Sequence, residues 1–147
     1  MKRLLFVIIS TMLTVKSGWA QQASPVGLWK SIDDTTGKPK ALIRITESSG
    51  ELKGIIEKLF QEKGEDPSPK CIKCEGAYKD QSVIGMTILF GMQQDSDEYS
   101  GGKILDPDNG QIYSSKLTLI DSGKKLSVRG YIGMPLLGRT QTWLREE

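Results

Sequence analysis

Histidine is absent from the 147 residues of the sequence, and cysteine occurs only twice. Without histidine, Ser-His-Asp and Cys-His catalysis in their usual forms are excluded. A zinc site normally takes four ligands from histidine and cysteine, so we expect no metal and no cofactor. Acidic pairs occur at Asp33 and Asp34 and at Asp106 and Asp108, in predicted turns where aspartate caps its own backbone. We therefore expect a protein that is not an enzyme.

The chain also lacks an apolar run long enough to span a bilayer. Leu4–Val15 is almost entirely apolar but has about 12 residues, against roughly 20 in a transmembrane helix. Two basic residues precede it, and the small residues Gly18 and Ala20 follow at signal-peptidase spacing. This order is typical of a secretory signal peptide. We expect residues 1–20 to be cleaved and residues 21–147 to form one periplasmic or secreted domain without a transmembrane segment.

Lysine and arginine form no cluster of the kind that binds nucleic acid, so we expect no nucleic-acid partner. The net charge of the full chain is +2. Cleavage would remove three basic residues and no acidic one, which leaves the mature chain slightly negative. The positive net charge of the full chain therefore comes from the signal segment and not from the folded domain.

No apolar stripe with helical spacing continues for ten residues. Short segments rich in Val, Ile, Tyr, Trp and Thr instead alternate with turns, which is typical of an antiparallel sandwich or barrel. An eight-stranded sheet of this length tends to close, because closure removes its edges. We predict an all-β fold, an antiparallel up-and-down β-barrel of about eight strands. The segments are residues 26–31, 41–46, 51–60, 81–92 (a strand or a short helix), 98–105, 111–120, 125–132 and 138–145.

The two cysteines stand close together as Cys71-Ile72-Lys73-Cys74. They lie in a polar, proline-containing segment predicted as a loop over residues 61–80. In an oxidising compartment, two such cysteines indicate a disulfide. Either it clips the shape of the loop, or it is redox-active, as CxxC motifs are in thioredoxin-like proteins.

Both ends of the mature domain carry a pattern found in lipocalin or calycin barrels. Gly27-Leu28-Trp29 resembles the Gly-x-Trp opening of their first strand, and Trp143 and Arg145 stand near the end of the chain. The resemblance implies that a basic residue of the last strand packs over the first-strand Trp29 and closes the barrel. Arg145 is the first choice and Arg139 the second. Alternatively, Trp29 and Trp143 are simply core aromatics of the same fold.

Several ordered motifs resemble the bacterial family catalogued as domain of unknown function 2147. The resemblance implies a small secreted or periplasmic protein with no known reaction, and it transfers no catalytic residue. The motifs are Gly27-x-Trp29, Asp33-x4-Lys38, the CxxC pair, Gly102-Lys103-Ile104-Leu105-Asp106-Pro107-x-Asn109-Gly110, Arg129-Gly130-Tyr131-Ile132-Gly133, and Gly138-Arg139-Thr140-Gln141-Thr142-Trp143.

The last two predicted strands hold the candidate binding residues. If they pair antiparallel, Arg129, Tyr131, Arg139 and Gln141 could cluster and favour an anionic or amphipathic ligand inside the barrel. The alternative is a solvated outer face or a buried structural network. Between the strands, residues 132–138 form an apolar connection that either plugs one barrel end or provides a greasy rim.

The sequence therefore favours a non-catalytic exported barrel that binds a small apolar or amphipathic ligand. The alternative is an envelope interaction, stress or inhibitor protein that acts through surface loops, with the loop over residues 61–80 as its working part. The presence of a cavity in the barrel would support the first hypothesis.

Overall fold

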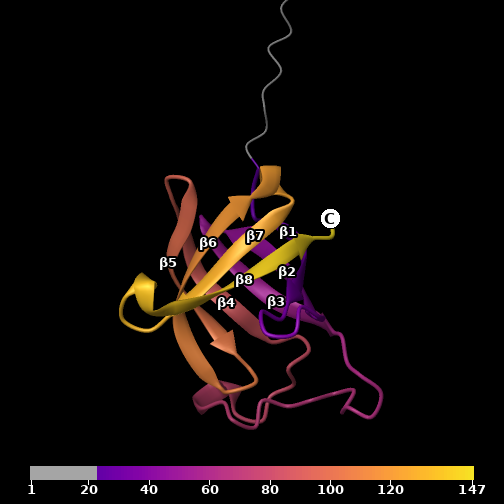
Figure 1. Ribbon diagram of the computed structural model, residues 1–147. Coiled ribbons are helices and arrows are strands. Elements are labelled where there is room, and N and C mark those ends of the chain that lie inside the picture. The colour runs from indigo at the N-terminus through magenta and orange to yellow at the C-terminus, as the bar shows by residue number, and fades with distance from the viewer. Residues whose placement is uncertain (1–22) are drawn as a thin grey trace, which may run out of the picture.

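The computed structural model describes residues 23–147, which form one antiparallel sheet closed into a barrel (Figure 1). The predicted signal segment lies outside these residues. Each strand pairs with its neighbours in chain order, and β1 pairs with β8, so the predicted all-β, up-and-down barrel is confirmed. The strands are β1 (Gly27–Ile32), β2 (Pro39–Ser48), β3 (Glu51–Leu59), β4 (Thr87–Asp95), β5 (Glu98–Asp106), β6 (Gln111–Ile120), β7 (Lys125–Tyr131) and β8 (Gly138–Arg145).

The predicted segment 81–92, left open between strand and helix, contributes a strand that begins only at Thr87. The residues before it belong to the long connection from β3. Gly85 has φ +87° and donates its N–H to the carbonyl of Ile56, and Ile56 donates its N–H to Met86. This turn sets the start of β4, because its geometry is incompatible with an extended strand.

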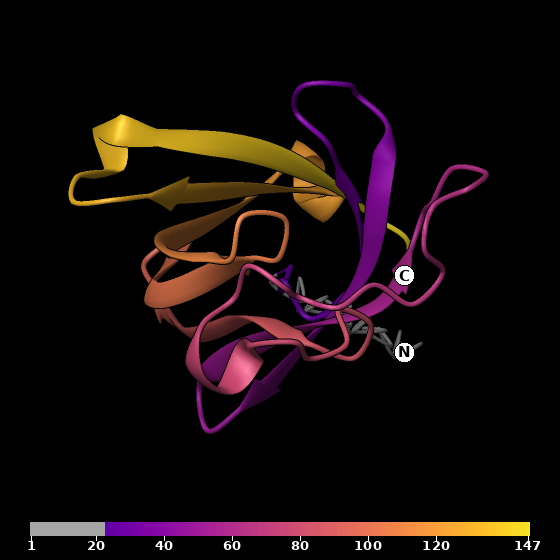
Figure 2. The same ribbon diagram turned by 90° about the horizontal axis from the view of Figure 1, so that it is seen from below.

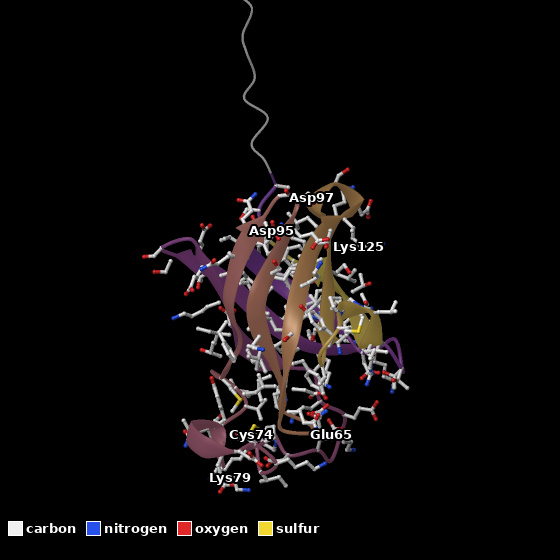
Figure 3. All side chains as sticks on the ribbon, turned by 90° about the vertical axis from the view of Figure 1, so that its left-hand side faces the viewer. Glu65, Cys74, Lys79, Asp95, Asp97 and Lys125 are labelled. Atoms are coloured by element: carbon white, nitrogen blue, oxygen red, sulfur yellow. A yellow bond between two sulfur atoms is a disulfide. The ribbon has the colours of Figure 1, made fainter. Side chains whose placement is uncertain are left out.

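The connections alternate between two ends of the barrel. The "closed end" carries the start of β1, the end of β8 and the short β2–β3, β4–β5 and β6–β7 turns. The "open end" carries the β1–β2, β3–β4, β5–β6 and β7–β8 connections. Figure 3 shows Asp95, Asp97 and Lys125 at the closed end and Glu65, Cys74 and Lys79 at the open end. The longer connections are therefore gathered at one end, where they can shape a site.

Trp29 and Arg145 close the barrel at the closed end. The guanidinium carbon of Arg145 lies 4.2 Å from the centroid of the Trp29 ring, within the range of a cation–π contact. The fully buried Trp29 donates its indole N–H to the carbonyl of Pro25 at 2.7 Å. Burial lowers the pKa of Arg145, although arginine remains charged at any pH the protein meets. Trp143 is also buried and belongs to the same hydrophobic core as Trp29.

The disulfide predicted between Cys71 and Cys74 is confirmed. Both residues are buried, at 0% and 2% exposure. The Cys71 N–H donates to the carbonyl of Gln81, and the N–H of Asp80 donates to the carbonyl of Cys71. Residues 71–81 of the β3–β4 connection therefore form a compact unit, called the disulfide lobe below. The lobe packs against the β5–β6 turn. Such a loop has an ordered shape despite containing almost no regular secondary structure.

One buried hydroxyl leads to a prediction about stability. Within residues 23–147, the Ser115 Oγ is the only fully buried side-chain polar atom without a hydrogen-bond partner. Replacing Ser115 by alanine is expected to raise the free energy of unfolding by about 1 kcal/mol, because the unpaired hydroxyl is lost. Urea denaturation followed by tryptophan fluorescence measures this.

Ser31 provides the matched control. It is equally buried, but its Oγ accepts the Ala41 N–H at 3.1 Å and donates to the Ala41 carbonyl. Ser31→Ala is therefore expected to lower the free energy of unfolding by about 1 kcal/mol. If both substitutions destabilise the protein equally, Ser115 has a partner such as an ordered water.

Candidate functional site

A cavity of about 780 Å³ enters the barrel from the open end. Its volume lies in the range of pockets that hold a small organic molecule. Its deep wall is apolar, and charged residues stand where the strands end. The apolar lining consists mainly of Ala41, Ile43, Ile56, Leu59, Val83, Ile88, Ile104, Leu105, Val128 and Trp143.

Small side chains on the inward face leave room for this cavity. Ser31, Ala41 and Gly130 line it, from β1, β2 and β7. A Cβ atom at Gly130 would lie 3.5 Å from both the Ile104 Cγ2 and the Tyr113 Cβ, which is ordinary van der Waals contact. The space inside the barrel near Gly130 therefore results from the small side chains on its inner face and not from backbone strain.

Arg139 and Asp34 form a two-pronged ion pair at the mouth. The Arg139 Nε donates to one carboxylate oxygen of Asp34 at 2.9 Å and an Nη to the other at 2.5 Å. The hydrogen bond from Arg139 lowers the pKa of Asp34. Because the pKa is lowered in the folded state, any stability from the pair is present at neutral pH. It is lost as the pH falls through that pKa.

A second ion pair joins Lys40 to Asp108 across the mouth. Burial opposes the charge of Lys40. The hydrogen bond to Asp108 and the charges of Asp108, Asp106 and Asp33 outweigh it and raise the pKa. Arg139 and Lys40 are therefore each paired with a carboxylate. Of the other charged residues that line the cavity, Lys70 is basic and Asp33 and Asp106 are acidic, so the mouth has no excess of positive charge to favour an anion.

Three of the four predicted binding residues line the cavity, namely Tyr131, Arg139 and Gln141. Gln141 lies opposite Val128, and its Oε1 accepts the Trp143 indole N–H at 3.2 Å. This leaves the amide nitrogen of Gln141 as a donor for a ligand.

Arg129 does not join this group. The β7–β8 register places it opposite Thr140 on the outer face, because Val128 and Gly130 are the residues that line the cavity. Its guanidinium donates to the Thr140 hydroxyl and to the carbonyls of Pro135 and Leu136. Side-chain alternation within one strand cannot show which face is inward.

Sequence reasoning missed the contributions of β1, of β2 and of the turn between them. Asp34 and Lys40 complete the ion pairs at the mouth, and Ser31 and Ala41 supply space in the wall. The available signal was the run of small and polar residues around a predicted turn, which did not distinguish cavity lining from an ordinary turn. Asp33 fits the expected turn role, since its carboxylate accepts the N–H groups of Thr35 and Thr36.

The β7–β8 connection does not plug the barrel. The side chains expected to fill its end are instead exposed, with Leu136 at 80% and Leu137 at 71%. Of this segment, Ile132, Leu137 and Gly138 line the cavity mouth. The plug interpretation is therefore wrong, because the hairpin projects outward from the barrel and not across it (Figure 2).

The described part of the chain holds no group of three or more acidic, cysteine or histidine side chains positioned to bind a metal ion. Within residues 23–147, no helix has the length and apolar character needed to cross a bilayer.

A closed eight-stranded antiparallel barrel with a cavity at one end is a lipocalin-like fold. A solved structure, protein HP1028 from the human pathogen Helicobacter pylori, is described as belonging to the lipocalin family. It matches with a TM-score of 0.72 at 17% identity, over 85% of this chain and 84% of that one. At this identity the likeness concerns the fold alone.

The family itself is identified from the sequence. The family model described as "Uncharacterized protein conserved in bacteria (DUF2147)" matches residues 27–145, so the chain belongs to this family. No curated protein matches the chain.

Proposed function

We propose that this protein is an exported, non-catalytic barrel that binds a small amphipathic molecule in its cavity. The observation that carries the proposal is the cavity of about 780 Å³, apolar in its depth and polar at its mouth. Such a site suits a ligand with an apolar body and a polar end. Export is supported by the signal-like N-terminal sequence, and the absence of histidine from the sequence supports a role other than catalysis.

The ion pairs at the mouth narrow the chemistry of the polar end. Arg139 is held by Asp34 and Lys40 by Asp108, so an anionic head group would have to displace a carboxylate to bind either of them. The remaining cation of the lining, the exposed Lys70, is outnumbered by the carboxylates of Asp33 and Asp106. A neutral or zwitterionic head group can hydrogen-bond to these pairs without separating them. Gln141 adds an uncharged polar contact through its amide nitrogen. The proposal therefore favours a neutral or zwitterionic amphipath over a fatty-acid-like anion.

A cavity-filling substitution tests the proposal. Gly130→Leu is expected to weaken binding of the neutral apolar probe N-phenyl-1-naphthylamine by about tenfold or more, because the new side chain occupies the cavity. The backbone of Gly130 does not have the positive φ that would penalise a side chain, so the fold is expected to persist. A fluorescence titration measures the affinity, and circular dichroism checks the fold.

Thr142→Leu is the matched control, since it adds the same side chain at an exposed position of β8. It is expected to leave probe binding unchanged. Undiminished binding by a folded Gly130→Leu variant would mean that the cavity is not the binding site. Native mass spectrometry of protein purified from an envelope fraction then identifies the ligand, and N-terminal sequencing of the exported form tests cleavage near Gln21.

The disulfide is proposed to be a structural clip. Its two residues are buried, which keeps the sulfurs from a thiolate that would exchange with them. A reduction potential below about −300 mV is expected for a bond of this kind. A higher potential would favour the redox alternative.

The alternative of action through surface loops is favoured by one observation, the exposed apolar segment between β7 and β8.

A further inference from the structure

The β7–β8 tip, defined here as residues 132–137, presents an unusual set of exposed apolar side chains. Four side chains in this short segment are mostly exposed, namely Ile132 at 63%, Met134 at 60%, Leu136 at 80% and Leu137 at 71%. Turns between strands are normally polar, and so are most other connections of this barrel. A concentrated apolar projection of this kind marks a contact surface.

The backbone of the tip is partly hydrogen-bonded within the protein, which prepares it in part to leave water. Arg129 donates from Nε to the Pro135 carbonyl at 2.6 Å and from Nη2 to the Leu136 carbonyl at 3.2 Å. The N–H groups of Met134 and Leu137 donate within the tip, and Pro135 has no N–H. Since unpaired backbone groups are the main obstacle to entering an apolar medium, this pairing removes part of the desolvation cost.

The tip also stands beside the entrance of the cavity. Ile132 and Leu137 line the mouth, and the hairpin that carries them extends away from the barrel (Figure 2). Tyr131, at the base of the tip, is of a residue type that favours the membrane–water interface. A surface that receives the tip would therefore lie beside the entrance of the cavity.

We propose that the β7–β8 tip docks on a phospholipid bilayer, so that the cavity exchanges its amphipathic ligand with the membrane. The part concerning the ligand rests on the function proposed above. A bilayer fits better than a protein partner for two reasons. The tip is a narrow projection of aliphatic side chains, whereas stable protein interfaces bury about 1,200 Å² or more around aromatic anchors. The cationic Arg129 at its base lies where lipid phosphates would be.

Sedimentation with vesicles of phosphatidylethanolamine and phosphatidylglycerol tests the docking. The double variant Met134→Asn, Leu136→Asn changes two exposed tip residues that do not line the cavity. It is expected to reduce the vesicle partition coefficient by about tenfold or more, because two apolar contacts with the acyl chains are lost. Ile120→Asn, which alters a 40% exposed apolar residue at the closed end, is expected to have no effect. Equal partitioning of the double variant and the parent protein would overturn the proposal.

A third variant separates docking from general stickiness. Arg129→Met makes the tip region more apolar but leaves the carbonyls of Pro135 and Leu136 unpaired. On vesicles of zwitterionic phosphatidylcholine, which carry no net charge, it is expected to weaken partitioning. Stronger partitioning of Arg129→Met would show that apolarity alone drives the contact, which would contradict the prepared-backbone argument.

The same variants distinguish failure of this inference from failure of the proposed function. Gly130→Leu is expected to lose the naphthylamine probe but to keep vesicle binding, and the tip double variant is expected to do the opposite. The parent protein could fail to bind vesicles and sediment as a dimer in analytical ultracentrifugation, while the double variant sediments as a monomer. In that case the tip binds a second copy of the chain, and membrane docking is refuted. If Gly130→Leu still binds the probe, the cavity is not the binding site, but the docking of the tip on membranes is not contradicted.

Discussion

Replacement of Arg145 by alanine is expected to lower the free energy of unfolding by about 3 kcal/mol, because one side chain holds the closed end together. Its guanidinium donates to the carbonyls of Gly123 at 2.7 Å and Ser24 at 2.6 Å while it stacks on Trp29. A further bond reaches the carbonyl of Val26 at 3.1 Å. The substitution would leave these carbonyls without a donor and remove the cover from the indole. Denaturation in guanidinium chloride, followed by tryptophan fluorescence, measures the change.

Two other substitutions show whether geometry or charge is responsible. Arg145→Lys keeps the charge, but an ammonium group cannot reach several carbonyls in a planar fan, so most of the loss is expected to remain. Arg44→Ala removes an arginine that pairs with Glu57 and Glu147 on the barrel surface, and a much smaller effect is expected. If Arg145→Ala and Arg44→Ala lower stability equally, Arg145 is not a closing element.

Gly110→Ala is expected to have an effect of similar size at the other end of the barrel. Gly110 has φ +75°, and a Cβ atom there would overlap the backbone carbonyl of Lys73. The Cβ atom of the new alanine and the carbonyl of Lys73 are both held by the backbone and cannot rotate apart. The β5–β6 turn and the disulfide lobe therefore have to separate. We expect a loss of about 3 kcal/mol in the free energy of unfolding, from the left-handed backbone and the lost docking together.

The control for this prediction is Gly37→Ala. Gly37 has a nearly identical φ of +72°, but no atom lies within 4 Å of the added Cβ. Only the backbone penalty remains, and a loss of about 1 kcal/mol is expected. Reduction by dithiothreitol under native conditions gives an independent measurement, since Gly110→Ala should expose the buried Cys71–Cys74 bond and Gly37→Ala should not. Equal rates of reduction would show that the lobe does not depend on this contact.

The disulfide lobe matters for the site because it forms part of the mouth. Pro69, Lys70 and Val83, on either side of the lobe, line the cavity together with the β5–β6 turn. If the disulfide lobe separates from the β5–β6 turn in Gly110→Ala, the entrance of the cavity becomes wider. The apolar residues behind Val83 then become exposed to water. Stability of the lobe and access to the cavity are therefore linked through one glycine contact.

The strands and their order could be predicted because their signals are local. Turn residues such as those around Asn109 and Gly110, and the period-two pattern of Tyr113, Ser115, Leu117 and Leu119, lie within a few residues of the structures that they specify. The strand ambiguity at residues 81–92 was resolved only by the pairing with β3 and β5. A short apolar run has no periodicity that distinguishes a strand from a helix.

The candidate site could be predicted only in part, because its chemistry depends on partners distant in the chain. Arg139 was singled out, but Asp34, which neutralises it, lies 105 positions away. Arg129 was grouped with Gln141, although the register faces them to opposite sides of the sheet. Arg129 alternates along β7 with the inward Val128, and Gln141 lies opposite Val128 on β8, so the pairing of the two strands places Arg129 and Gln141 on opposite faces.

By itself, the sequence determined the succession of eight strands and turns, the pairing of the two cysteines and the absence of histidine chemistry. All of these depend on residues that are neighbours in the chain or on composition alone. The tertiary structure decided that Arg145 covers Trp29, that Gly130 opens space for a cavity, and that the apolar tip faces outward. These depend on closure of β1 onto β8 and on the register that closure imposes, which bring together residues more than a hundred positions apart.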